Sequence, residues 1–134
     1  MGSLEGAVVI VTGAARGIGR AIAEELGQGG AKVVVNYAHS KGPAEDLVAQ
    51  LHKSGSPESV AIQADVSDPE QAASLLDETI QRFGRIDVLV NNASRFYRTS
   101  IGKITEYAWE DLMNSNLKAP FFLSQAAAPH LALN

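Results

Sequence analysis

Four short apolar runs, rich in valine and isoleucine, alternate along the chain with longer segments in which apolar positions recur at helical spacing. The runs are continuous, which is typical of parallel strands that are buried on both faces. We predict strands at residues 7–11, 32–37, 59–64 and 86–90, and helices at residues 20–26, 43–53, 69–83 and 106–131. This order predicts one α/β domain over residues 1–134, a Rossmann-like doubly wound parallel sheet represented by its N-terminal half of about four strands with flanking helices.

Residues at the ends of two predicted helices support these boundaries. Asp68 is a favourable N-cap residue, Pro69 fits the first helical position, and Gln71 stands three residues after the cap. Gly84 follows the last apolar position of the same helix, and Thr105 can cap the last helix. Both helices therefore have a defined start.

The turn Thr12–Gly19, with the sequence TGAARGIG, lies between the first predicted strand and the first predicted helix. Glycine lacks the Cβ that would hold backbone amides away from phosphate oxygens, and a helix N-terminus carries partial positive charge. A glycine pattern alone is weak, but here a strand precedes it, a helix follows it and further strand–helix units come after. The sequence lacks Gly-Lys-Ser/Thr, so we predict a dinucleotide site rather than a P-loop.

Composition limits the partners that the chain can have. The chain has 46% hydrophobic and 19% charged residues, a net charge of −4 and no cysteine. We therefore expect no disulfide, no thiolate chemistry, no nucleic-acid partner and no membrane segment. The three histidines, His39, His52 and His130, have no metal-binding spacing, so we predict no metal site. No targeting signal precedes the first strand, which favours a cytoplasmic protein.

The chain resembles the short-chain dehydrogenase/reductase family. The resemblance rests on TGxxxGIG at Thr12–Gly19, Asp65-Val66 after the third strand, Asn91-Asn92-Ala93 after the fourth, and Asn116-Leu117 on the last helix. It implies that Asp65 holds the adenine ring and that Asn91 lies against the cofactor. The turn and the resemblance together predict these cofactor-binding residues: Gly13, Ala15, Arg16, Gly17, Ile18, Gly19, Asp65, Val66, Asn91 and Ala93.

The end of the second strand indicates which nicotinamide cofactor binds. NAD-binding members place a carboxylate there for the ribose hydroxyls, whereas this chain has Asn36-Tyr37 and no acid before Glu45. A carboxylate about 4 Å from a phosphate charge would cost roughly 4 kcal/mol at an effective dielectric constant of 20. Arg16, Ser40 and Lys41 can supply contacts to a 2′-phosphate. We therefore predict NADP(H) rather than NAD(H), and add Asn36, Tyr37 and Ser40 to the cofactor-binding residues.

Asn116 lies four residues before Pro120 in the last predicted helix. Proline has no N–H, so the bond to the Asn116 carbonyl cannot form, and we expect a kink there. In the family that the chain resembles, the corresponding carbonyl holds a water in a proton relay, so the resemblance implies a catalytic role for Asn116. The alternative is a tolerated kink whose carbonyl faces solvent.

The resemblance also implies catalytic side chains that are absent from residues 1–134. The family uses a Tyr general acid, a Lys four residues later and a Ser, all of which normally follow the segment seen here. Tyr37 and Lys41 have the right spacing but stand at the adenosine side, so we reject them as the catalytic pair. We expect a domain truncated before the Tyr/Lys segment, marginal or self-associating by itself, and a homo-oligomer in the full-length form. The alternative function is an inactive nucleotide-binding fragment or subunit.

The substrate prediction depends on two further stretches. Residues 91–97 (NNASRFY) and 116–129 (NLKAPFFLSQAAAP) resemble the pteridine-reductase branch of the family. In that branch, the aromatic residue matching Phe96 stacks on the pterin ring and the serine matching Ser94 lines the same pocket. That branch usually has a basic residue where this chain has Gly17. A small-molecule carbonyl or pterin-like substrate is therefore expected, with 3-oxoacyl, polyol or aromatic ketone reduction as the wider alternative.

Overall fold

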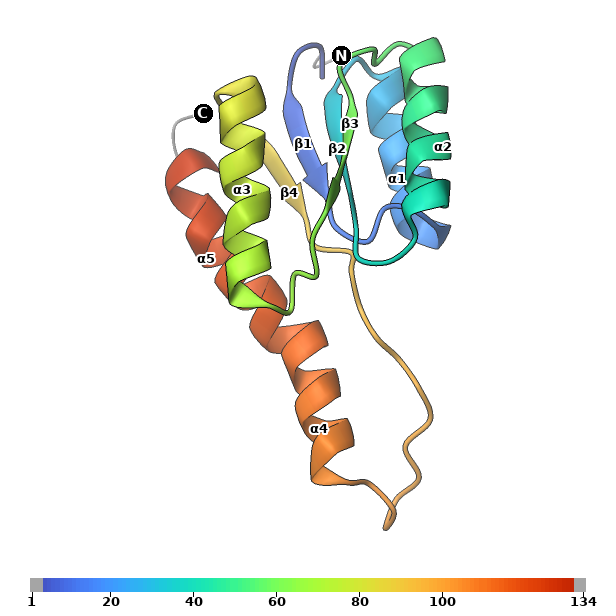
Figure 1. Ribbon diagram of the computed structural model, residues 1–134, viewed down its shortest axis with the longest axis vertical. Coiled ribbons are helices and arrows are strands. Elements are labelled where there is room, and N and C mark those ends of the chain that lie inside the picture. Colours follow the sequence, from blue (N-terminus) through green and yellow to red (C-terminus); the bar gives the residue numbers. More distant parts are fainter. Residues whose placement is uncertain (1–3, 132–134) are drawn as a thin grey trace.

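The computed structural model describes residues 4–131, which form strands and helices in alternation (Figure 1). The strands are β1 (Val8–Val11), β2 (Lys32–Tyr37), β3 (Val60–Gln63) and β4 (Val88–Val90). The α-helices are α1 (Gly17–Gln28), α2 (Lys41–Lys53), α3 (Pro69–Phe83), α4 (Glu106–Met113) and α5 (Ala119–Leu131), and a π-helical segment, η1 (Asn114–Lys118), joins α4 to α5.

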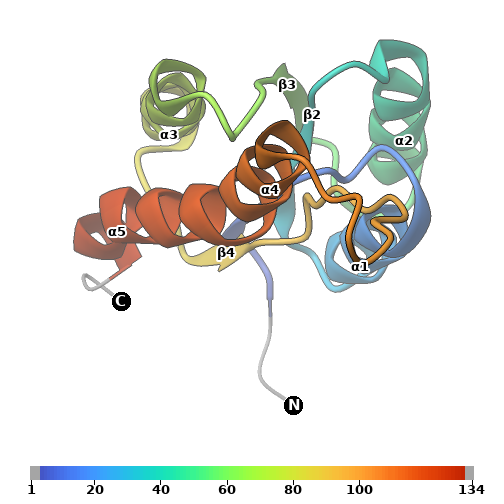
Figure 2. The same ribbon diagram turned by 90° about the horizontal axis from the view of Figure 1, so that it is seen from below.

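All pairings in the described sheet are parallel, in the order β3-β2-β1-β4. Helices α1 and α2 cover one face of the sheet, and α3 and α5 cover the other (Figure 2). The chain therefore has the Rossmann-like, doubly wound α/β architecture that its apolar pattern predicts.

Residues of each central strand alternate between two cores. Val9 and Val11 of β1 pack on the α1/α2 side, whereas Ile10 packs on the α3/α5 side. In β2, Val33 and Val35 belong to the first core and Val34 to the second. Since both faces are covered, β1 and residues 33–35 of β2 are apolar on both sides, which explains their continuous apolar runs.

Several predicted boundaries are wrong by a few residues. The first and second helices begin at Gly17 and Lys41, three and two residues earlier than predicted, and the fourth strand begins at Val88 rather than at residue 86. Ile86 is fully buried although it lies outside the strand. An apolar pattern reports burial, so it does not distinguish a strand residue from a buried residue beside it.

The last helix departs from α geometry upstream of its proline. Residues Asn114–Lys118 form η1, where the Ala119 amide donates to the Asn114 carbonyl five residues back. The π-helical segment ends two residues before Pro120, close to the position of the expected kink. Such segments are rare in helices and often occur at functional sites.

The two predicted caps are confirmed. The Asp68 carboxylate accepts from the amides of Glu70 and Gln71, and the Thr105 hydroxyl accepts from the Ala108 amide. Gly84 closes α3 with a left-handed backbone, at φ 74°. Within residues 4–131, no helix is both long and apolar enough to cross a membrane.

One side of the molecule leaves large apolar side chains exposed. Strand β4 lies at an edge of the described sheet, and Val88 is 38% exposed. Helix α4 buries none of its residues. The exposed apolar side chains of α4, η1 and α5 include Tyr107, Trp109, Leu117, Phe121 and Phe122.

Candidate dinucleotide-binding site

Thr12 joins the carboxyl ends of β1 and β4. Its hydroxyl oxygen accepts from the amides of Asn92 (3.0 Å) and Ala93 (2.9 Å). The Asn92 side-chain amide donates back to the carbonyls of Thr12 and Gly13, each at 3.1 Å. These bonds fix the segment after β4 against the start of the glycine turn, although the two lie about eighty residues apart in sequence.

Three glycines give the turn its shape. Gly13 and Gly17 both have φ near +59°, a conformation that other residues rarely adopt. A Cβ on Gly19 would lie 2.3 Å from the Asn92 side-chain nitrogen and 2.7 Å from the Gly13 carbonyl oxygen. Gly19 therefore allows the first turn of α1 to pack against the strand ends.

The N-terminus of α1 faces this turn without a side-chain cap. Arg16 occupies the N-cap position with an extended backbone, and its side chain makes no capping hydrogen bond. The first amides of α1 thus remain available to an anion, which the helix dipole favours at this end.

Asn36, near the end of β2, holds the glycine turn in place through its side chain. It is 1% exposed, its Oδ1 accepts from the Gly13 amide at 3.2 Å, and its Nδ2 donates to the carbonyls of Ile62 (3.3 Å) and Ala64 (3.1 Å). Asn36, a predicted cofactor contact, lines the pocket described below, and its side-chain amide bonds to the protein at both its oxygen and its nitrogen. Its role in the structure is to hold the ends of β1, β2 and β3 in place.

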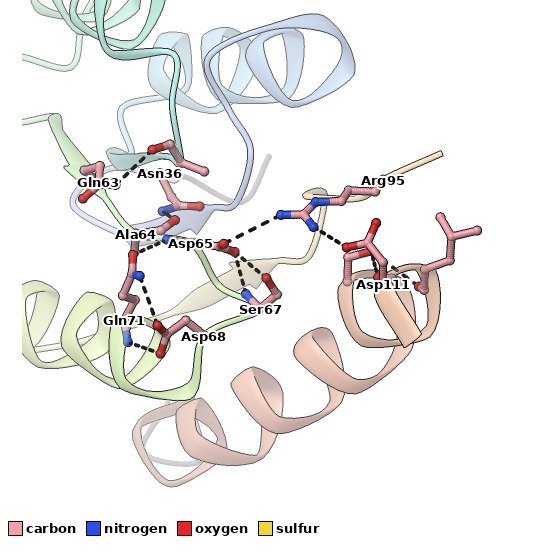
Figure 3. A network of polar contacts seen from close by, with 12 residues as sticks. Asn36, Gln63, Ala64, Asp65, Ser67, Asp68, Gln71, Arg95 and Asp111 are labelled. Carbon is pink, nitrogen blue, oxygen red and sulfur yellow. Dashed lines mark hydrogen bonds and ion pairs between the residues drawn. The ribbon is translucent and has the colours of Figure 1, made fainter. Parts of the chain in front are cut away.

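Asp65, directly beyond β3, carries the carboxylate of the site. Its Oδ1 accepts from the Ser67 hydroxyl at 2.5 Å and from the Ser67 amide at 3.0 Å. These bonds, led by the hydroxyl, lower the pKa of Asp65, and Arg95 and His39 add to the effect. The Asp65 amide donates to Gln71 Oε1 at 2.8 Å, so the capping segment of α3 positions this residue (Figure 3).

Arg95 connects Asp65 to α4. Its Nη2 lies 3.7 Å from Asp65 Oδ2, and its Nη1 donates to Asp111 Oδ1 (Figure 3). The other oxygen of Asp111 accepts from the Tyr97 hydroxyl at 2.9 Å. Desolvation of the phenol and this bond raise the pKa of Tyr97 above its ordinary value.

A pocket of about 460 Å³ lies at the carboxyl ends of the strands. Seven predicted site residues line it: Gly13, Ile18, Asn36, Asp65, Val66, Ala93 and Ser94. The sequence analysis missed several further lining residues: Ala38, His39, Ala64, Ser67, Asn92, Arg95 and Ser115. Asn92 could have been found from the NNA motif, whereas His39, Arg95 and Ser115 carry no local signal.

Other predicted cofactor residues lie around this pocket rather than in its wall. Ala15 is buried in the α1/α2 core, Tyr37 packs against the same core, and Arg16 is exposed. Ser40 is the N-cap residue of α2. Lys41, at the start of α2, forms an exposed ion pair with Glu45 at 3.9 Å.

The residues predicted to lie near the reacting end are held by α5 and η1. The Asn91 side chain donates to Ser124 Oγ at 2.9 Å, which ties β4 to α5. The Asn116 side chain accepts from the Arg95 amide (2.9 Å) and donates to the Arg95 carbonyl (2.7 Å). Phe96 is 93% exposed on the segment between them.

Known proteins share this arrangement. The profile of the family described as short chain dehydrogenase matches residues 7–134. The chain belongs to the short chain dehydrogenase family. Versicolorin reductase 1 of Aspergillus parasiticus is 44% identical to this family member over 128 residues, which cover 96% of the chain and 48% of the reductase. An uncharacterised oxidoreductase of Methylorubrum extorquens is 44% identical over 131 residues, 98% of the chain and 52% of that protein.

Solved structures of the short chain dehydrogenase family superpose closely. A short chain dehydrogenase from Burkholderia cenocepacia in complex with NADP has a TM-score of 0.91 and 39% identity, and the match covers 97% of this chain and 53% of that one. A blue fluorescent protein from a metagenomic library in complex with NADPH has a TM-score of 0.89 and 40% identity, covering 96% and 52%. The chain thus spans about half the length of the relatives that it matches.

Proposed function

We propose that this chain binds NADP(H) and is the cofactor-binding half of a reductase that transfers hydride between NADP(H) and a small-molecule carbonyl or alcohol. The observation that carries the proposal is the glycine turn, where Gly19 admits no Cβ and the uncapped N-terminus of α1 stands beside a pocket containing Asp65. The two solved relatives described above, one with NADP and one with NADPH, support the choice of cofactor.

The residues present fit the parts of a dinucleotide. The amides of α1 and the open backbone at Gly17 suit the diphosphate, because no side chain occupies the space beside Gly17. Asp65 offers a carboxylate acceptor to the adenine amino group. Ala93 and Ser94 follow β4 at the same end of the sheet and would contact the cofactor toward its nicotinamide. Bound NADPH would supply the hydride.

The preference for the 2′-phosphate rests on charge. No Asp or Glu follows β2 directly, Arg16 is exposed at the N-cap of α1, and Ser40 begins α2. Because a carboxylate at this point would repel the phosphate, its absence favours NADP(H) over NAD(H).

The pterin-like substrate remains a narrower prediction. It rests on Ser94 and Phe96 alone, and neither relative described above carries the name of a pteridine reductase. The Aspergillus relative is named a reductase of versicolorin, which supports the wider alternative of a substrate other than a pterin. For Asn116, the proposed part in proton transfer belongs to its carbonyl, since its side chain is bonded to Arg95. A cytoplasmic location and a homo-oligomer also remain predictions.

Titration of the purified chain with NADPH and NADH tests the proposal. We expect NADPH to bind and NADH to bind at least tenfold more weakly, with Arg16→Ala reducing this ratio. Equal affinities would contradict the NADP(H) assignment, and no binding of either would contradict the nucleotide site.

A second candidate function is nucleotide binding without turnover. Among the described pocket-lining residues there is no Tyr or Lys, and Tyr37 packs against the core. NADPH oxidation followed at 340 nm with a panel of ketones and a pterin distinguishes the two functions. Binding without oxidation by the chain and by any longer form of it would favour the second.

A further inference from the structure

Arg95 is the only Lys or Arg among the described residues that line the pocket. Its guanidinium lies between two carboxylates from different parts of the fold (Figure 3). Nη1 donates to Asp111 Oδ1 on α4, and Nη2 lies 3.7 Å from Asp65 Oδ2 beyond β3. The side chain therefore spans one side of the pocket.

The backbone of Arg95 is fixed as well. The Asn116 side chain bonds to both the amide and the carbonyl of Arg95, at 2.9 Å and 2.7 Å. Asp111 is itself held, since its second oxygen accepts from the Tyr97 hydroxyl. A charge anchored at both its backbone and its head group loses little conformational entropy when a ligand binds.

The pocket needs such a cation. NADP(H) is a polyanion, and Asp65 adds a further negative charge at the position expected for the adenine. Like charges repel across such a pocket, and an opposite charge nearby offsets this repulsion.

We propose that Arg95 is a further cofactor-binding residue of this chain: its guanidinium, positioned by Asp111, offsets the charge of Asp65 and so weakens the repulsion between this carboxylate and the dinucleotide. This inference rests on the proposed function, because it concerns the same pocket. A residue that only tethered the loop to α4 would have no effect on the salt dependence of binding, and a residue that obstructed the pocket would weaken binding by its presence.

NADPH titrations of the wild-type chain, Arg95→Gln, Arg95→Lys and Arg98→Gln test the inference at several salt concentrations. Arg98 is the matched control, because it is exposed on the same segment and does not line the pocket. We expect Arg95→Gln to raise the Kd for NADPH about three- to tenfold, and to make the Kd less dependent on salt. Arg95→Lys keeps the charge and should stay within about twofold of wild type, as should Arg98→Gln.

The outcomes separate the two proposals. If the wild-type chain does not bind NADPH, the proposed function is wrong and the inference is wrong with it. If the wild type binds and Arg95→Gln binds equally well or more tightly, only the inference is overturned. An equal loss in Arg95→Lys and Arg95→Gln, with unchanged salt dependence, would also overturn it in favour of a tether. Thermal melts of each variant show whether it is folded.

Discussion

The side-chain oxygen of Asn36 accepts a hydrogen bond from the backbone amide of Gly13 at 3.2 Å, which joins the end of β2 to the glycine turn. The nitrogen of the same side chain donates to the carbonyls of Ile62 and Ala64. One buried amide thus determines how the ends of three strands sit beneath the cofactor pocket.

Replacement of Asn36 should therefore affect both stability and binding. Asn36→Ala leaves the Gly13 amide and two carbonyls without these partners, and a buried unsatisfied polar group costs about 1–3 kcal/mol. We expect the free energy of unfolding to fall by about 3 kcal/mol in urea denaturation and NADPH affinity to fall with it. Gln63→Ala is the control, because Gln63 makes one exposed hydrogen bond, to the Ala38 carbonyl. A loss below about 1 kcal/mol in Asn36→Ala would contradict the bracing role.

Gly19→Ala should damage the turn directly. The added Cβ would meet the Asn92 side chain and the Gly13 carbonyl, and the carbonyl cannot move without shifting the turn. Overpacking of this kind costs about 1–3 kcal/mol, and we expect NADPH binding to fall by at least tenfold in the same titration. Gly42→Ala is the matched control, since nothing lies within 4 Å of its Cβ position in α2. That variant should be neutral or stabilised by up to about 1 kcal/mol.

Asn116→Ala should loosen the segment before α4. The substitution removes both side-chain hydrogen bonds to the Arg95 backbone, each worth about 0.5–1.5 kcal/mol. We expect faster amide hydrogen exchange at Arg95 and its neighbours, with exchange in β1 and β2 unchanged. Asn114→Ala, two residues earlier in η1, provides the comparison. Unchanged protection at Arg95 would show that other contacts hold this segment.

Asp87 should make stability depend on pH. The Arg85 side chain, and then the Val8 amide at 2.8 Å, lower the pKa of Asp87 below its ordinary value of 3.8. A carboxyl whose pKa is lower in the folded state stabilises above its unfolded pKa, and this contribution is lost as the pH falls through the folded value. Asp87→Asn should melt at a lower temperature than wild type at pH 7, and the difference should shrink below about pH 3.8. Asp77→Asn, at an exposed position on α3, is the comparison, and a constant difference for Asp87→Asn would refute the assignment.

The fold could be predicted because its physical causes are local. A parallel strand covered on both faces needs a continuous apolar run, and Val8–Val11 and residues 33–35 of β2 satisfy this requirement. Asp68 and Thr105 predict helix starts, because the side chain of an N-cap residue accepts hydrogen bonds from backbone amides at most three residues later. The π-helical segment could not be predicted. A backbone hydrogen bond to the carbonyl five residues back, in place of four, does not change the pattern of apolar residues.

The candidate site could be predicted only in part. The glycine turn and Asp65 have recognisable sequence patterns, and both lie at the pocket. Arg95 pairs with partners 30 and 16 residues away, a relationship that only the folded chain creates. The hydrogen bonding of Asn36 within the protein could have been predicted. A polar side chain that follows directly on a buried apolar run is itself buried and needs hydrogen-bond partners in the protein.

The exposure of helix α4 bears on which part of this protein could be replaced by protein engineering. It buries no side chain of its own and extends beyond the carboxyl ends of the strands (Figure 1). Because the two cores lie on the faces of the sheet, their packing does not depend on the residues between Phe96 and Trp109. We therefore expect both cores to keep their packing when this stretch is exchanged with that of a relative.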